Sequence, residues 1–93
     1  MIKSFASKET DKIFSREISR KFQQSIQQIA RRKLEILDAT DDLQDLRIPP
    51  SNHLEKLSGD RKGQHSIRIN KQWRICFEWR DGDAYNVEIV DYH

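Results

Sequence analysis

The fold is decided by the stretch WRICFEWR-DG-DAYNVEIVDYH, residues 73–93. In its first half a large apolar side chain occupies every second position, and Tyr85, Val87 and Ile89 continue the alternation in the second half. A period of two is typical of half-buried β-strands. Asp81-Gly82, between the two runs, is a strong hairpin signal. The stretch therefore predicts two antiparallel strands that share one apolar face.

The segment before this hairpin extends the predicted sheet. Leu54–Leu57 reads as a short strand, residues 58–63 as a turn with two glycines, and Ile67 and Ile69 as the apolar positions of a further strand. Residues 1–6 alternate in the same way and predict a short first strand. Tight turns between successive strands favour an antiparallel meander.

The N-terminal part predicts two helices. Ser7 is placed to cap the first, whose apolar positions are Ile13, Phe14 and Ile18, and Ser19 to cap a second helix that runs to about Asp38. On a 3.6-residue period the second helix has one apolar arc, made of Phe22, Ile26, Ile29, Ala30, Leu34 and Leu37. Lys33 falls inside this arc and is expected to extend along its edge, with a contact to a partner as the alternative.

These elements predict an α+β fold in a single domain, residues 1–93. Two N-terminal helices pack on one face of a small, mainly antiparallel sheet of four to five strands. A single cysteine, Cys76, excludes an internal disulfide, and no apolar run is long enough to be a membrane span. We therefore expect a cytoplasmic protein with no membrane partner.

Charge is unevenly distributed along the chain. Residues 1–33 carry nine Lys and Arg against three acidic residues, and residues 55–80 carry seven against three, although the net charge is only +2. Basic segments in a small domain indicate a polyanion or an acidic protein as partner. Ordinary solvated charge is the alternative.

The face of the sheet opposite the helices is the expected site, because no element remains to cover it. By alternation this face carries Arg68, Arg74, Cys76, Glu78, Arg80, Glu88, Val90 and Tyr92, with Lys56, Arg61 and Lys62 at its rim. Guanidinium groups bind phosphate in a bidentate manner, and an aromatic ring stacks on unpaired bases. The pattern predicts an RNA-binding surface. Cross-strand Arg–Glu pairs without any ligand are the alternative.

The last strand ends in Asp91, Tyr92 and His93, which supply a carboxylate, a phenol and an imidazole. An imidazole near Arg74 could exchange protons with an RNA 2′-hydroxyl or with a leaving 5′-oxygen. Asp91 is in phase with the core residues Val87 and Ile89, which favours an orienting role. The three histidines lack ligand spacing, so no metal and no cofactor is expected.

Three segments carry a resemblance to a known family: NHLEKLSGDRKGQHSIRIN (52–70), WRICF (73–77) and NVEIVDYH (86–93). In this order and spacing the chain resembles the HigB toxins of type II toxin–antitoxin systems. These belong to the RelE/ParE superfamily, and the likeness is greatest to its GraT-like branch. The resemblance covers nearly the whole chain and implies the RelE-like fold, two helices on a small antiparallel sheet.

The resemblance further implies a ribosome-dependent endoribonuclease that enters the A site of the 70S ribosome and cleaves mRNA there. The 2′-hydroxyl attacks the adjacent phosphate, which requires no metal. The family's functional residues fall on Asp91, Tyr92, His93 and Arg74: a proton-transfer group at His93, a phosphate clamp at Arg74, a stacking or orienting group at Tyr92 and an orienter at Asp91. The implied partner is a HigA-like helix-turn-helix antitoxin, through which alone the chain would reach operator DNA.

The chain departs from the family pattern at two positions. Ser58 stands where many members have Lys, with Lys56 as its nearest replacement, and His53 matches a family histidine only with a shift, Glu55 standing in the unshifted register. Two other functions are compatible with the sequence. One is a ParE-like inhibitor of DNA gyrase, and the other is a module that inhibits by ribosome binding or assembly without cleaving RNA.

Overall fold

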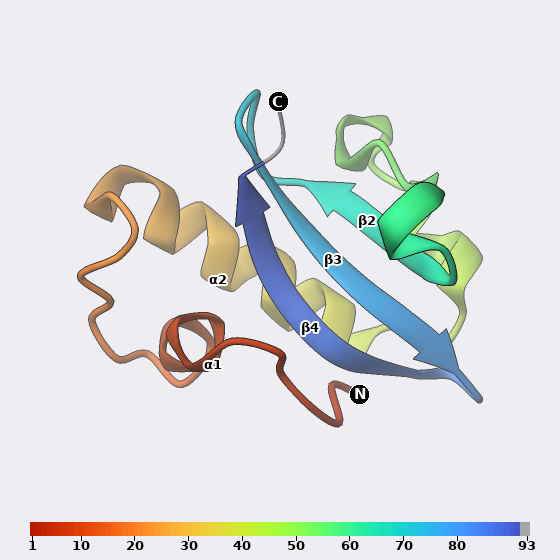
Figure 1. Cartoon of the computed structure of the whole chain (residues 1–93), viewed down its shortest axis with the longest axis horizontal. Coiled ribbons are helices and arrows are strands. Elements are labelled where there is room, and N and C mark those ends of the chain that lie inside the picture. Colours follow the sequence, from red (N-terminus) through yellow and green to blue (C-terminus); the bar gives the residue numbers. More distant parts are fainter. Residues whose placement is uncertain (92–93) are drawn as a thin grey trace.

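The hairpin at residues 73–91 forms the centre of the sheet, as predicted. In the computed structural model, which describes residues 1–91, β3 (Trp73–Arg80) pairs antiparallel with β4 (Asp83–Asp91). β2 (Gln64–Arg68) pairs with the other edge of β3, and the two-residue β1 (Glu55–Lys56) pairs with β2. The sheet order is β1-β2-β3-β4 (Figure 1), so the predicted meander is confirmed.

Residues 1–6 join this sheet through isolated bridges and form no strand of their own. Ile2 and Phe5 form parallel bridges with Ala84 and Val87 of β4. The backbone N–H of Lys3 donates to the Ala84 carbonyl over 2.7 Å, and the N–H of Val87 donates to the Ser4 carbonyl over 3.0 Å. Residues 1–6, the predicted additional strand, therefore pair with β4 without forming a regular strand. β4 is hydrogen-bonded along both of its edges, to β3 and to residues 1–6.

The first helix, α1 (Lys8–Phe14), begins where predicted. The Ser7 hydroxyl accepts a hydrogen bond from the Thr10 N–H over 3.3 Å. Ile18, expected among its apolar positions, lies beyond its end and is 84% exposed.

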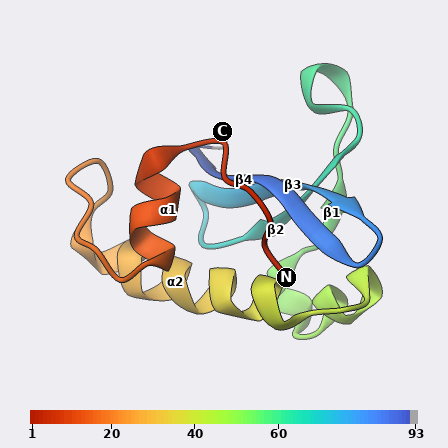
Figure 2. The same ribbon diagram turned by 90° about the horizontal axis from the view of Figure 1, so that it is seen from below.

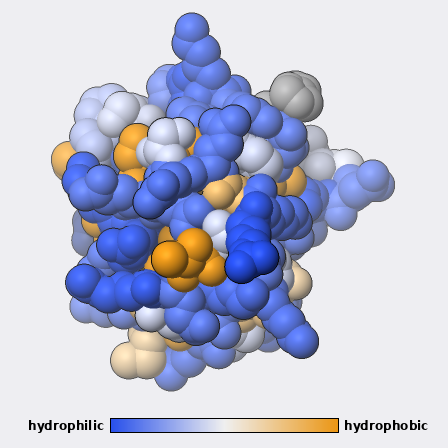
Figure 3. All heavy atoms as spheres, turned by 90° about the vertical axis from the view of Figure 1, so that its left-hand side faces the viewer, coloured by the Kyte–Doolittle hydropathy of each residue, from blue (hydrophilic) through white to orange (hydrophobic). Residues whose placement is uncertain are grey.

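The second helix, α2 (Gln24–Ala39), has its N-cap at Gln23 instead of Ser19 and so begins four residues later than predicted. Ser19 is buried, and its hydroxyl donates to Glu9 of α1 over 2.6 Å instead of capping α2. Gln23 takes the N-cap position without a side-chain hydrogen bond. Figure 3 shows the side of the molecule where α1 and α2 are connected, and there apolar atoms are surrounded by hydrophilic side chains.

The helices cover one face of the sheet, with α2 running across it (Figure 2). The apolar core between the layers contains Ile13, Phe22, Ile26, Ala30, Leu34, Leu37, Leu46, Ile67, Ile69, Ile75, Phe77, Ala84, Val87 and Ile89. Two short 3-10 helices, η1 (Leu43–Arg47) and η2 (Pro50–Asn52), connect α2 to β1. Among residues 1–91, no helix has the length and apolar character needed to cross a membrane.

One phase assignment in β4 is wrong. Asn86 has a left-handed backbone, with φ of 53°, and the β3–β4 register shifts between Cys76 and Glu78. This bulge reverses the alternation, so that Ala84, and not Tyr85, is buried in the core. Tyr85 instead lies on the other face, where the Arg80 guanidinium is 4.0 Å from its ring centroid.

The expectation that nothing covers the second face is also wrong. The connection from Leu57 to Gly63, which contains the 3-10 helix η3 (Gly59–Arg61), folds back over β2 and β3 (Figure 1). Leu57 is 7% exposed, and Cys76 and Ser66 are fully buried. This connection therefore covers part of the second face.

Candidate functional site

Arg74 occupies the middle of the predicted site, and it is buried, with 7% of its surface exposed. Its Nε donates to the Ser66 hydroxyl over 2.8 Å, and one Nη donates to the His53 carbonyl over 2.5 Å. The other Nη lies 3.9 Å from a carboxylate oxygen of Glu55, which is half exposed. Arg74 thus ties β1, β2 and the chain after η2 to the central strand.

A basic pocket lies beside Arg74. Arg68 is the register partner of Arg74 across β2 and β3, and its Nε donates to the Asn70 carbonyl over 3.0 Å. The pocket has a volume of about 310 Å³ and is lined by Lys33, Ser51, His53, Arg68, Ile69, Asn70 and Lys71. The structure therefore brings together three predicted residues, namely Arg74, Arg68 and His53. We call the group formed by these three with Lys33 and Lys71 the basic cluster.

Lys33 reaches the basic cluster from α2. Its ammonium group donates to the Asn52 side-chain carbonyl of η2. The amide of Asn52, which is fully buried, donates in turn to the Leu46 and Ile48 carbonyls. Partial burial lowers the pKa of Lys33, and the nearby charge of Arg32 lowers it further. A bound anion would stabilise the charged ammonium of Lys33 and so oppose both of these pKa-lowering effects.

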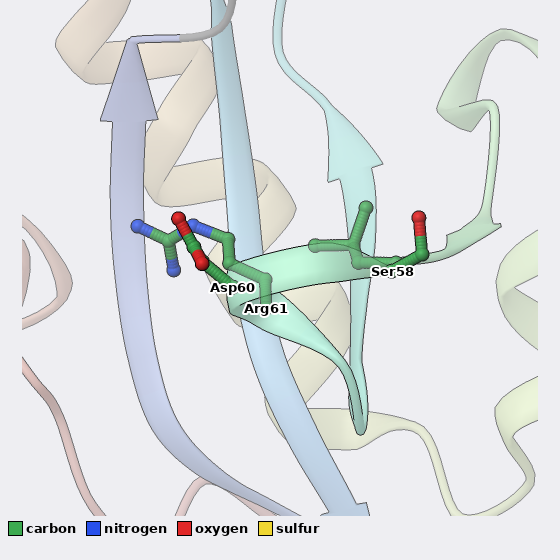
Figure 4. Close-up of a pocket in the computed structure, with 4 residues that line it drawn as sticks. Ser58, Asp60 and Arg61 are labelled. Atoms are coloured by element: carbon green, nitrogen blue, oxygen red, sulfur yellow. The ribbon is translucent and has the colours of Figure 1, made fainter.

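The predicted rim residues lie apart from this cluster. Arg61 extends from η3 across β3 toward β4 (Figure 4) and forms an ion pair with Glu88 over 3.4 Å. With Leu57, Ser58 and Asp60 it lines a separate pocket of about 150 Å³. Lys62 is exposed on the same turn.

Lys56 is not on the Arg74 side of the sheet. Lys56 is the register partner of His65, whose ring lies 6.0 Å from that of Phe77 in the core. Burial, followed by the charge of Lys56, lowers the pKa of His65. Directly paired residues share a face, so Lys56 lies on the same face as His65 and Phe77, opposite Arg74. Lys56 is therefore not placed to take the role of the lysine that many family members have at the position of Ser58.

Asp91 ends β4 at the same end of the sheet as Arg74. It is the register partner of Trp73, and its carboxylate accepts a hydrogen bond from the Gln72 side chain over 3.1 Å. By alternation along β4, Asp91 lies on the same face of the sheet as Ile89, as expected. Its side chain is exposed because β4 extends past the end of the core there. The predicted residues Tyr92 and His93 lie outside the described residues.

Three contributors to this site were missed by sequence reasoning. Lys33 was placed at the edge of the apolar arc of the second helix, Glu55 was considered only as the residue aligned with a family histidine, and Lys71 was given no role. The observed register places Glu55 opposite Ser66, on the face of the sheet that carries Arg74. No sequence signal linked Lys33 to η2. Among residues 1–91, no three His, Cys, Asp or Glu side chains converge as metal ligands would.

Comparison with known proteins gives three relatives. The chain is 56% identical over 62 residues to "Toxin HigB-1" of Vibrio cholerae serotype O1, covering 67% of the chain and 65% of that protein. It is 34% identical over 67 residues to an uncharacterized protein of Haemophilus influenzae, covering 72% and 66%. It is 48% identical over 40 residues to "Endoribonuclease HigB" of Proteus vulgaris, covering 43% and 44%. The matches thus span less than two thirds of each relative's length.

The fold is shared with the solved YoeB–YefM complexes from Staphylococcus aureus. Two of these give TM-scores of 0.55 and 0.56 at 18% identity, covering all of this chain and 98% of the matched chain. This likeness confirms the predicted α+β architecture. A family model described as "RelE-like toxin of type II toxin-antitoxin system HigB" matches residues 3–93. The chain therefore belongs to the HigB-like toxin family, as the sequence motifs predicted.

Proposed function

We propose that the chain is a ribosome-dependent endoribonuclease that cleaves mRNA in the ribosomal A site. The observation that carries the proposal is the basic cluster, which lies at the end of the sheet to which β4 delivers Asp91. Family membership supports it, as does the printed name of the Proteus vulgaris relative, an endoribonuclease. The cytoplasm, where ribosomes are found, is the expected location.

RNA brings its own nucleophile to this reaction. The 2′-hydroxyl attacks the adjacent phosphorus and the 5′-oxygen leaves, which gives a 2′,3′-cyclic phosphate and a 5′-hydroxyl. One proton leaves the 2′-oxygen and one is added to the 5′-oxygen, so the step balances without a metal or cofactor. His93 is assigned to proton transfer, Tyr92 to stacking or orienting the base, and Asp91 to orienting the site.

Arg74 is assigned to the phosphate. Its guanidinium lies 3.9 Å from the Glu55 carboxylate through Nη1, and its Nε and second Nη are bonded to Ser66 and His53, which fixes its orientation. A phosphate oxygen is an acceptor that suits a guanidinium held in this way. Arg68 and His53, with Lys33 and Lys71, would bind neighbouring phosphates, and Arg61, Lys62 and Lys56 would contact ribosomal RNA.

A second candidate is ribosome binding without cleavage, and the burial of Arg74 favours it. Arg74 bonds four parts of the chain together, which is a structural role that needs no reaction. No observation favours a gyrase inhibitor. The proposed partner in either case is a HigA-like helix-turn-helix antitoxin, and the solved structures of similar fold are toxin–antitoxin complexes.

Primer extension on mRNA from translating ribosomes separates the two candidates. Wild-type chain should produce cuts within the A-site codon, and His93→Gln should lower the cleavage rate by at least 100-fold with unchanged ribosome binding. Lys8→Gln, an exposed change on α1, serves as the control. Ribosome binding without any cut by the wild-type chain would establish the second candidate.

A further inference from the structure

Lys33 is held at the basic cluster by an asparagine that lies outside the cluster. It stands on the side of α2 that faces the core, since Ala30 and Leu37, one helical turn before and after it, are both fully buried. The Lys33 side chain is half-buried and ends at η2, where its ammonium group donates to the side-chain carbonyl of Asn52. The two residues therefore join α2 to η2 beside the pocket of the basic cluster.

The orientation of the Asn52 amide is fixed by its other contacts. Its nitrogen donates to the Leu46 carbonyl over 3.1 Å and to the Ile48 carbonyl over 3.3 Å, and its side chain is fully buried. Two carbonyl acceptors require the amide nitrogen on their side, so the amide oxygen has to face Lys33. Because both ends of the amide are bonded, Asn52 offers the ammonium an acceptor with one fixed position.

A lysine is a costly donor if its only purpose is to satisfy this amide. Partial burial and the charge of Arg32 both lower its pKa, so its surroundings disfavour the charged ammonium. Among residues 1–91, none of Lys33, Arg68 and Lys71 forms an ion pair with a carboxylate. An ammonium group has three hydrogens to donate, and Asn52 accepts one of them. An anion in the pocket would accept another and supply the missing charge.

We propose that Asn52 is a positioning residue for RNA binding, which holds the Lys33 ammonium in the pocket where a backbone phosphate of the RNA binds. The inference rests on the proposed function, which assigns RNA to the basic cluster. Asn52 does not contact the RNA and acts through the ammonium alone. A lysine that is already ordered in the free protein loses less side-chain entropy when the phosphate binds, so the affinity is higher.

The test is a double-mutant cycle between Lys33 and Asn52, measured by fluorescence anisotropy as affinity for a single-stranded RNA oligomer. At about 0.1 M salt, Lys33→Met should weaken binding about fivefold, the loss that follows from a salt slope of about 0.7 for one phosphate contact. Asn52→Ser should weaken it about threefold, because the freed lysine then has to be ordered by the RNA. The double variant should bind as Lys33→Met does, since no ammonium remains to be positioned.

Two controls separate positioning from an effect on the fold. Ser19→Ala removes a different buried hydrogen bond, from Ser19 to Glu9 of α1, and should lower stability without changing RNA affinity. Lys8→Met makes the same change as Lys33→Met at an exposed position of α1 and should bind RNA as the wild type does.

Asn52→Asp is the second variant at this position and is used if Asn52→Ser does not fold. Its carboxylate keeps an acceptor beside the ammonium of Lys33 but cancels its charge, so the affinity should fall about as far as in Lys33→Met. Gln28→Glu, the matching change at an exposed residue of α2 outside the cluster, should bind RNA as the wild type does. Wild-type affinity in Asn52→Asp would contradict the positioning role.

The cycle has two further outcomes that overturn the proposal. An equal loss from Asn52→Ser with and without Lys33→Met would show that Asn52 acts only on the fold. Wild-type affinity in Lys33→Met, with a loss in Arg68→Ala, would remove Lys33 and Asn52 from the RNA site and leave the proposed function intact. If Arg68→Ala also binds as tightly as the wild type, the basic cluster does not bind RNA, and the proposed function fails together with the positioning role.

Discussion

The charged side chain of Arg74 is largely buried, and its removal would leave two hydrogen-bond acceptors, the Ser66 hydroxyl and the His53 carbonyl, without this donor. Arg74→Ala should lower the free energy of unfolding by about 2–4 kcal/mol, because the buried Ser66 hydroxyl would lose its donor and the His53 carbonyl would lose the hydrogen bond that ties it to β3. Urea denaturation measures the change. Arg80→Ala, at a side chain 60% exposed, is the matched control and should cost about 1 kcal/mol or less. Equal midpoints for Arg74→Ala and wild type would contradict the structural role.

His65 gives a prediction for pH. Burial lowers its pKa in the folded protein below the ordinary value of 6.5, so the unfolded chain takes up a proton at higher pH than the folded one. The stability contributed by neutral His65 is therefore present above pH 6.5 and is lost as the pH falls through the folded pKa. Urea midpoints measured between pH 7.5 and pH 5 should fall more steeply for wild type than for His65→Phe. Parallel slopes would show that His65 does not titrate with unfolding.

Single residues also explain where sequence reasoning succeeded and failed. Arg68 and Arg74 were correctly assigned to one face because each alternates with a core isoleucine of its own strand, Ile67 on β2 and Ile75 on β3. Tyr85 was misassigned because Asn86 adopts φ of 53°, and asparagine is one of the few residues that does so readily. Nothing in the pattern of apolar residues marks that reversal.

Among the elements, the connection between β1 and β2 has the most testable effect. It covers Cys76, which is fully buried, and burial raises the pKa of its thiol. Arg61→Ala, which removes the ion pair with Glu88, should raise the rate of thiol labelling by about an order of magnitude, since that pair and Leu57 hold the connection down. Lys62→Ala, on the same turn but exposed, should label at the wild-type rate. A neutral aromatic disulfide reagent reports the rate.

This connection was read as a solvated turn because its glycines and charged residues are typical of one. Leu57 was the only sign of a second apolar layer, and one leucine in a short strand is ambiguous. The start of α2 was misplaced for a related reason: a serine hydroxyl serves equally well as a cap or as a buried donor, and Ser19 bonds Glu9. Elements with long periodic runs were predicted well, and short contacts between elements were not.

Over the whole molecule, positive charge gathers at the basic cluster. If Lys33, Arg68 and Lys71 each neutralise one phosphate, the affinity for a single-stranded RNA oligomer should fall with salt at a logarithmic slope of about −2. Fluorescence anisotropy between 50 and 300 mM salt (roughly the range in which such slopes are measured) gives this slope. Arg68→Ala should reduce it by about 0.7.

Arg20→Ala, at an exposed residue outside the basic cluster, is the control for this measurement and should leave the slope unchanged. A change as large as that of Arg68→Ala would show that RNA also contacts the protein outside the basic cluster. A flat salt dependence in the wild type would show that the basic cluster does not contact phosphates.

The pairing of residues 2–5 with β4 has a consequence for how the chain folds during its own synthesis. Ile2 and Phe5 bridge to Ala84 and Val87, positions 82 residues further along. A contact of such sequence separation forms late, since the intervening chain must be made and ordered first. Residues 2–5 therefore stay unpaired with β4 until β4 itself has been synthesised.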